Sequence, residues 1–186
     1  MRNKFGFILI NPQLGENIGA CARSIKNFGF KKLSIVSPKF TFPNHKTKVT
    51  SVGAYDIIEN TKLFENTVKA ISEFDIIIAL SARRRDINKR HITIKDFTNI
   101  IKKKNDLNFG LMFGPEASGL SNKDISLSNF ILQIPTSKKF KSINLSHSLT
   151  IICYEIFKIL NKKSFNKKSK KLKISSKLKI TSLVKH

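Results

Sequence analysis

The chain has 186 residues, a length typical of one domain with at most a short appendage. Hydrophobic residues make up 40% of it and charged residues 25%, a profile that excludes a disordered chain and indicates a globular protein with a sizeable core. Because 35 Lys and Arg residues face only 12 Asp and Glu residues, the formal net charge is +23.

Five short apolar runs, each followed by a polar or proline-containing segment, are predicted to be buried strands. In chain order they cover residues 5–10, 33–36, 74–80, 109–113 and 130–134. Residues 15–19 are expected to form a loop leading into a helix that ends at Gly29, with Asn17 as a candidate helix cap. Further helices are predicted at residues 49–58, 61–72, 94–101 and 145–160.

The alternation of these elements indicates the fold class. Strands that are apolar throughout and are separated by helices are typical of α/β proteins, in which a mainly parallel sheet carries helices on both faces. Ligands of such sheets bind beyond the carboxyl ends of the strands. The loops expected to carry function are therefore residues 11–17, 81–85, 114–119 and 135–144.

The last 26 residues differ from the rest in composition. Residues 161–186 contain ten lysines and no acidic residue, whereas residues 1–160 contain every predicted strand and helix. We therefore predict one domain over residues 1–160 and a Lys-rich tail over residues 161–186. The tail is either a basic arm that becomes ordered on RNA or an ordinary solvated end.

Several classes of protein are excluded or disfavoured. No apolar run approaches the roughly 20 residues of a membrane span, and the apolar run at residues 5–10 is too short for a signal peptide, so a cytoplasmic protein is expected. Cys21 and Cys153 lie in apolar helical patterns and are predicted to be buried thiols. No cysteine or histidine cluster suggests a metal site. The motifs GxxxxGK[ST], GxGxxG, GxSxG and HExxH are all absent.

The positive charge points to a polyanionic partner, with nucleic acid as the first candidate and a membrane surface as the second. The excess of lysine alongside Ile, Asn and Phe is also what an A/T-rich genome would impose. Arginine is distributed differently, because four of the six arginines lie between Arg83 and Arg90. The planar guanidinium suits bidentate phosphate contacts, so Arg83, Arg84 and Arg85 are predicted to bind RNA.

Three segments that follow predicted strands carry unusual polar residues. The first is Asn17-Ile18-Gly19-Ala20-Cys21-Ala22-Arg23, in which Arg23 lies off the apolar stripe. The second is Gly114-Pro115-Glu116-Ala117-Ser118-Gly119, a glycine-flanked acidic turn. The third begins at Ile134-Pro135 and continues in Ser142-Ile143-Asn144-Leu145. Taken singly, each is also compatible with an ordinary turn or helix cap.

Together these segments resemble the three signature motifs of the SPOUT superfamily of RNA methyltransferases, in its TrmH-like branch. Their order, spacing and strand context agree over residues 5 to 160. The Asn11-Pro12 opening, the Ser81-Ala82-Arg83 segment and Asn144-Leu145-Ser146-His147 are most similar to the TrmJ group, which methylates the ribose at position 32 of the tRNA anticodon loop. Ile143 replaces the leucine that this motif usually contains.

The resemblance implies a homodimer with a C-terminal trefoil knot, and S-adenosylmethionine as the cofactor. It implies that the cofactor is held by Ala79, Leu80, Ser81, Gly114, Ile134, Lys141, Ser142 and Ile143. It implies a catalytic neighbourhood of Asn17, Arg23, Glu116, Ser142 and Asn144. Within the family Arg23 would be a general base; a role in gripping phosphate and stabilising alkoxide charge is chemically easier, because guanidinium stays protonated.

Two other functions fit the same residues. One is a ribosomal RNA 2′-O-methyltransferase, although such relatives often carry an extra N-terminal RNA-binding domain. The other is a non-catalytic RNA-binding protein of the same fold, which would be expected to lose Arg23 or Ser142. Binding of S-adenosylmethionine, measured by calorimetry, separates the catalytic from the non-catalytic alternative.

Replacing Arg83, Arg84 and Arg85 with alanine should weaken RNA binding and reduce its dependence on salt, because each phosphate contact releases counterions when it forms. The measurement is the RNA dissociation constant across a range of salt concentrations. An unchanged slope would show that the three arginines are ordinary solvated side chains.

Overall fold

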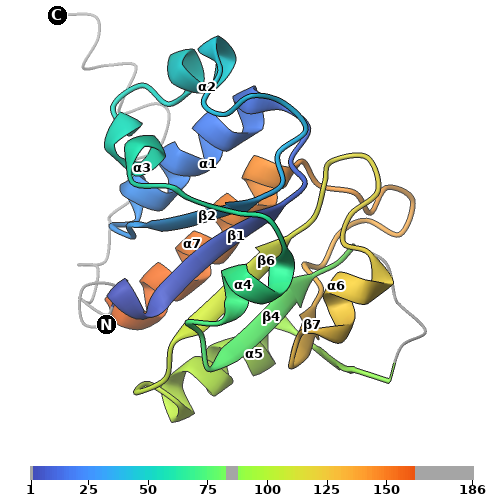
Figure 1. Ribbon diagram of the computed structural model, residues 1–186. Helices are drawn as coiled ribbons and strands as arrows, with labels where there is room; N and C mark the ends of the chain where they lie inside the picture. Colours follow the sequence, from blue (N-terminus) through green and yellow to red (C-terminus); the bar gives the residue numbers. More distant parts are fainter. Residues whose placement is uncertain (1, 83–87, 162–186) are drawn as a thin grey trace, which may run out of the picture.

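The computed structural model describes residues 2–82 and 88–161. Within these ranges seven strands form one parallel sheet in the order β3-β2-β1-β6-β4-β7-β5 (Figure 1). This confirms the predicted α/β class. The strands are β1 (Phe5–Ile10), β2 (Lys32–Val36), β3 (Lys62–Phe64), β4 (Ile76–Leu80), β5 (Arg90–Ile92), β6 (Phe109–Phe113) and β7 (Phe130–Leu132).

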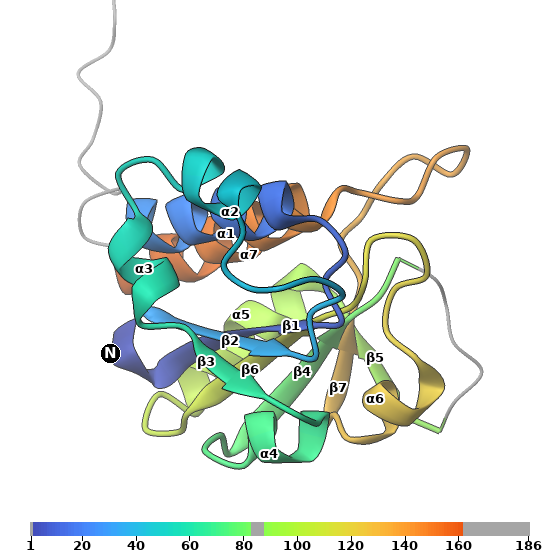
Figure 2. The ribbon, with the colours of Figure 1, turned by 45° about the horizontal axis from the view of Figure 1, so that its top comes forward.

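Helices cover both faces of the sheet. Figure 2 shows α1, α2, α3 and α7 above it and α4 and α6 below it. A short 3₁₀ turn, Arg2–Lys4, precedes β1. The helices are α1 (Gly15–Asn27), α2 (His45–Thr50), α3 (Tyr55–Glu59), α4 (Thr67–Ile71), α5 (Ile94–Lys103), α6 (Asn122–Ser126) and α7 (Leu145–Leu160).

Strand β1 shows why the central strands are apolar throughout. Phe7 and Leu9 belong to the core that α1, α3, α5 and α7 cover. Ile8 and Ile10 belong to the core on the other face, beneath α4 and α6. Successive side chains of a strand point to opposite faces, so a strand covered on both sides is mainly apolar at consecutive positions.

The first helix starts earlier than predicted. Residues 15–19 are not a loop, because α1 begins at Gly15 directly after Leu14, which has extended backbone angles. Asn17 is therefore inside the first turn and does not cap the helix; its side chain bonds to other loops instead. The predicted end at Gly29 is confirmed, with a φ of 73° in the left-handed region that favours glycine.

The segment between β2 and β4 was predicted less well. Residues 61–72 are not one helix: β3 pairs with β2, and α4 begins after Asn66, whose side chain accepts a hydrogen bond from the Lys69 backbone N–H. Residues 49–58 are divided between α2 and α3. Strand β5 and helix α6 were not predicted. Short edge strands depend on a neighbour that is distant in sequence, which local patterns do not contain.

The two cysteines are buried, as predicted, where α1 packs against α7. Burial raises the pKa of the Cys21 thiol far above its usual range, and the Glu116 carboxylate adds to the effect. Burial likewise raises the pKa of Cys153, with a smaller contribution from Cys21. Both thiols therefore stay neutral in the folded protein.

Folding stability should fall as the pH rises above about 8.5, the usual pKa of an unfolded thiol. Unfolded chains then lose thiol protons that folded chains keep, so each thiol removes up to about 1.4 kcal/mol per pH unit. The measurement is the urea midpoint between about pH 8 and pH 9.5. The Cys21→Ala/Cys153→Ala variant is the control. An identical pH dependence in both proteins would contradict the prediction.

Candidate active site

A cavity of about 190 Å³ opens at the carboxyl ends of β4, β6 and β7. Three segments line it, each following one of these strands, as expected for a parallel sheet. Of the residues expected to hold a cofactor, seven lie in its wall: Leu80, Ser81, Gly114, Ile134, Lys141, Ser142 and Ile143. Ala79 is buried in β4, one residue before the wall begins, and is not among the described residues that line the cavity.

Gly114 is in a position where only glycine fits. A Cβ added there would overlap the backbone of Gly119 and Leu120. The loop after β6 therefore folds tightly back on itself and brings Glu116 to the cavity wall. The structure thus explains the glycine at the start of the second motif by close packing of backbone on backbone.

Glu116 joins the loop after β6 to the segment after β1. Its carboxylate accepts hydrogen bonds from the backbone N–H of Gln13 at 2.8 Å and of Leu14 at 3.3 Å. It also accepts one from the Asn17 amide at 2.8 Å. In return, the Gln13 side chain accepts a bond from the Ala117 N–H at 3.1 Å. These contacts hold the first and second motifs together.

Asn144 adds the third motif to this network. Its amide nitrogen donates to the Asn17 side-chain oxygen at 3.0 Å. Its own oxygen accepts from the backbone N–H of Ser146 at 2.8 Å and from the Ser146 hydroxyl at 2.7 Å. Asn144 also caps α7 through these bonds. Three segments more than 25 residues apart in sequence therefore meet in one hydrogen-bonded chain.

The donor and the acceptor of each hydrogen bond in this network are fixed by the groups at its two ends. A backbone N–H can only donate and a carboxylate can only accept, so the amides of Asn144 and Asn17 must both point their nitrogens towards Glu116. The network of hydrogen bonds continues behind the site. The Thr150 hydroxyl donates to the Ser146 carbonyl at 2.7 Å and lies 2.6 Å from the Ser24 hydroxyl. Ser146 is 7% exposed. Sequence reasoning missed the role of Ser146, although its place two residues after a helix cap is a usable signal.

Arg23 occupies a different position. It is exposed on α1 and does not line the cavity. It makes no hydrogen bond or ion pair with any residue in the described parts of the chain. The structure therefore brings Asn17, Glu116 and Asn144 together beside a cavity that contains Ser142, and it leaves the Arg23 guanidinium free for a partner.

The predicted RNA-binding residues Arg83, Arg84 and Arg85 lie outside the described residues, as does the tail beyond residue 161. The RNA contacts predicted for them stay predictions. In the described ranges no group of His, Cys, Asp and Glu side chains could hold a metal ion. Among the described helices, none combines the length and the apolar character needed to cross a membrane.

The fold and this site define a parallel α/β protein with a ligand cavity built from three sequence motifs. The sequence pattern of the SpoU rRNA methylase family matches residues 4–154, and the chain belongs to that family. The tRNA (cytidine-2′-O-)-methyltransferase TrmJ of Methanocaldococcus jannaschii is 37% identical over 160 residues, which cover 83% of this chain and 69% of that protein.

Two further relatives support the same grouping. LasT of Escherichia coli, an uncharacterized tRNA/rRNA methyltransferase, is 30% identical over 151 residues, covering 80% of this chain and 66% of its own. The crystal structure of TrmJ from Z. mobilis superimposes with a TM-score of 0.79 at 27% identity, covering 97% of this chain and 76% of that one. The chain therefore spans about two thirds of the length of the curated relatives it matches.

Replacing Glu116 with alanine should lower the free energy of unfolding by about 1–2 kcal/mol, because three donors lose a charged acceptor. Glu65→Ala is the matched control: its side chain is 84% exposed and forms only a surface ion pair with Lys69, so its effect should stay within about 0.5 kcal/mol. The measurement is urea unfolding of both variants. Equal losses would show that Glu116 does not hold the loops.

Proposed function

We propose that this chain is an S-adenosylmethionine-dependent RNA methyltransferase that modifies a ribose 2′-hydroxyl of tRNA, with position 32 of the anticodon loop as its target. The observation that carries the proposal is the convergence of Asn17, Glu116 and Asn144 beside the cavity that Ser142 lines. The names of the relatives favour tRNA over ribosomal RNA as the substrate, since the TrmJ relative at 37% identity is named for tRNA.

The residues of the cavity fit S-adenosylmethionine. Leu80, Phe113, Leu132 and Ile134 provide an apolar wall that suits a flat base. Hydroxyl and backbone groups of Ser81, the loop at 114–119 and residues 141–143 provide donors and acceptors for a ribose and an amino-acid group. When bound, this cofactor supplies an activated methyl group to a nucleophile.

The chain must supply alignment and charge stabilisation for a hydroxyl that is a poor nucleophile. The one-directional chain from Ser146 to Glu116 keeps Asn144 and Asn17 in single orientations, so the wall near Ser142 is preorganised. Ser142 orients the ribose at that wall, and Asn144 positions the segment that carries Ser142 through its bonds to Asn17 and Ser146. Arg23 binds the adjacent phosphate and stabilises developing negative charge on the oxygen, a role that suits a permanently protonated guanidinium.

A homodimer is part of the proposal, because Arg23 lies outside the cavity of its own chain. The outer side of α1 and α7 has exposed apolar residues that a second subunit would cover: Leu14 is 47% exposed and Tyr154 is 43% exposed. The Tyr154 ring packs at 6.1 Å from that of Phe28, just after α1. A dimer through this side would bring Arg23 towards the cavity of the partner.

A trefoil knot at the C-terminus and a cytoplasmic location complete the proposal. The sheet order supports the knot, since β7 lies between β4 and β5 although it is the last strand in sequence. After β7 ends at Leu132, the chain passes through residues 133–144 and continues as α7, which packs on α1. The cytoplasmic location is inferred from the proposed action on tRNA.

Replacing Arg23 with alanine should reduce methyl transfer by about a hundredfold or more, the usual loss when one charge-stabilising group is removed. Cofactor binding should be unchanged, because Arg23 does not line the cavity. The measurements are transfer of labelled methyl groups to tRNA, mass spectrometry of the nucleosides, and calorimetry with S-adenosylmethionine.

Lys26→Ala is the control on the same helix, since Lys26 forms only an exposed ion pair with Asp56. It should retain the activity of the parent protein. Near-normal turnover in Arg23→Ala would refute the role of Arg23. Absence of 2′-O-methylated nucleosides with the unaltered protein, in the presence of cofactor and tRNA, would refute the proposed function itself.

A further inference from the structure

The segment between β7 and α7 exposes an aromatic ring next to the cavity. Figure 2 shows this segment projecting from the body of the molecule. Phe140 lies on it and is 75% exposed, the highest value among the exposed large hydrophobic residues of the described chain. A single exposed ring is common on protein surfaces, and what distinguishes Phe140 is its place in the chain directly before the cavity-lining residues Lys141 and Ser142.

The two ends of the segment are anchored in the cavity wall. Ile134 at one end and Lys141, Ser142 and Ile143 at the other all line the cavity. Between them the segment is closed by a hydrogen bond from the Thr136 hydroxyl to the Lys141 carbonyl at 3.4 Å. Phe140 precedes Ser142 by two residues in the chain, and it therefore lies near the rim of the cavity.

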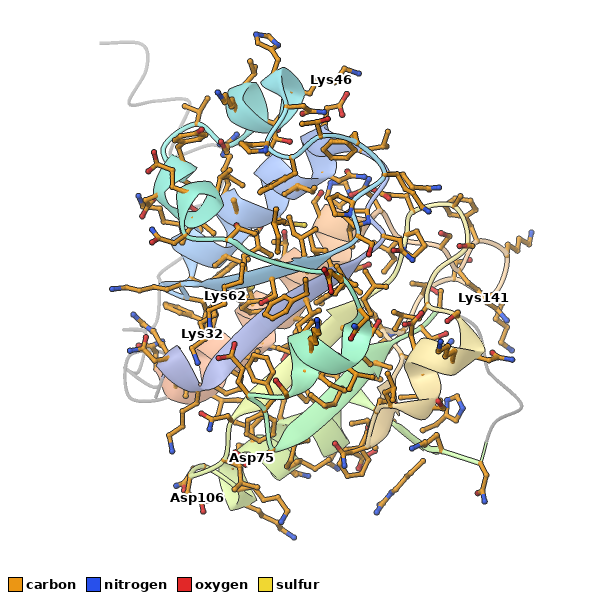
Figure 3. The ribbon with its side chains drawn as sticks, viewed as in Figure 1. Lys32, Lys46, Lys62, Asp75, Asp106 and Lys141 are labelled. Atoms are coloured by element: carbon orange, nitrogen blue, oxygen red, sulfur yellow. The ribbon has the colours of Figure 1, made fainter. Side chains whose placement is uncertain are left out.

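The surroundings of Phe140 are positively charged. Lys138, Lys139 and Lys141 flank it and all three are exposed. Figure 3 shows Lys141 on the side of the molecule opposite Lys32. No acidic residue occurs between Asp124 and Glu155, so no carboxylate of this segment offsets the lysines. A ligand that used both the lysines and the ring would be anionic and would offer a flat apolar face.

An unpaired nucleotide of RNA has both properties. Proteins bind single-stranded nucleic acid by stacking bases on aromatic side chains while basic residues contact the backbone. A base inside a duplex is already stacked on both sides and cannot offer its face. Inorganic polyanions would satisfy the lysines but not the ring.

We propose that Phe140 is a stacking platform for an unpaired base next to the methylated ribose, with Lys138, Lys139 and Lys141 contacting the neighbouring phosphates. This inference rests on the proposed function and specifies how that site selects single-stranded RNA. It makes Phe140 a binding residue that discriminates a loop nucleotide from one in a helix.

Fluorescence of a Phe140→Trp variant tests the stacking directly. The chain contains no tryptophan, so the new indole is the sole one. Titration with a stem-loop RNA should quench it, whereas fully paired RNA or polyphosphate should have little effect. Val68→Trp, at a position that is 59% exposed on α4, is the matched control and should respond to none of them.

Several results would overturn the proposal. These are no quenching by the stem-loop RNA, equal quenching by polyphosphate or duplex RNA, or an emission change that depends on protein concentration alone. The last would place Phe140 in a contact between copies of the chain.

Activity of Phe140 variants provides a second, independent readout. Phe140→Ala should raise the KM for tRNA by about tenfold, in line with the usual loss of one stacked base. Its kcat and its affinity for S-adenosylmethionine should stay near those of the parent, and Phe140→Tyr should restore the KM. A fall in kcat alone, or no recovery with tyrosine, would contradict stacking. If the unaltered protein methylates no RNA, the proposed function fails, while quenching by loop RNA would still support the platform.

Discussion

The carboxylate of Glu116 is the constraint on which the site depends. It accepts bonds from the backbone N–H groups of Gln13 and Leu14, which lie immediately before α1. A glutamate three residues into a helix often does this for its own N-terminus, but here the acceptor comes from about 100 residues away. One side chain thus binds the two residues that lead into α1 and ties them to the loop after β6. It also places a negative charge near the N-terminus of α1, where the helix dipole favours one.

Asn17 and Asn144 extend this constraint to α7. Each amide uses one end to accept and the other to donate, so replacing either one would leave a neighbour without a partner. Because the direction of the bonds is imposed by the Ser146 N–H at one end and by a carboxylate at the other, the network has a single arrangement. A cavity built on such a network needs little reorganisation when a ligand binds, which is what charge stabilisation in catalysis requires.

The position of the lysines at the cavity rim is more informative than the net charge of the protein. A net charge of +23 alone is compatible with biased composition. Most of the lysines in the described parts of the chain are exposed to solvent. At the rim of the cavity, however, lysines surround an exposed aromatic ring on an anchored segment. The combination is selective in a way that bulk charge is not, since phosphates and a free base face are needed together.

The sequence by itself determined the fold class, the five main strands, the two long helices and the three motif segments, because these depend on local apolar patterns and on runs of residues close in the chain. Only the tertiary structure decided the rest. Residues 62–64 form a strand because they pair with β2. Asn17 links the loops because its side chain bonds to Glu116 and Asn144, which are distant in sequence. The separation of Arg23 from the cavity likewise follows from how α1 packs, which no local pattern encodes.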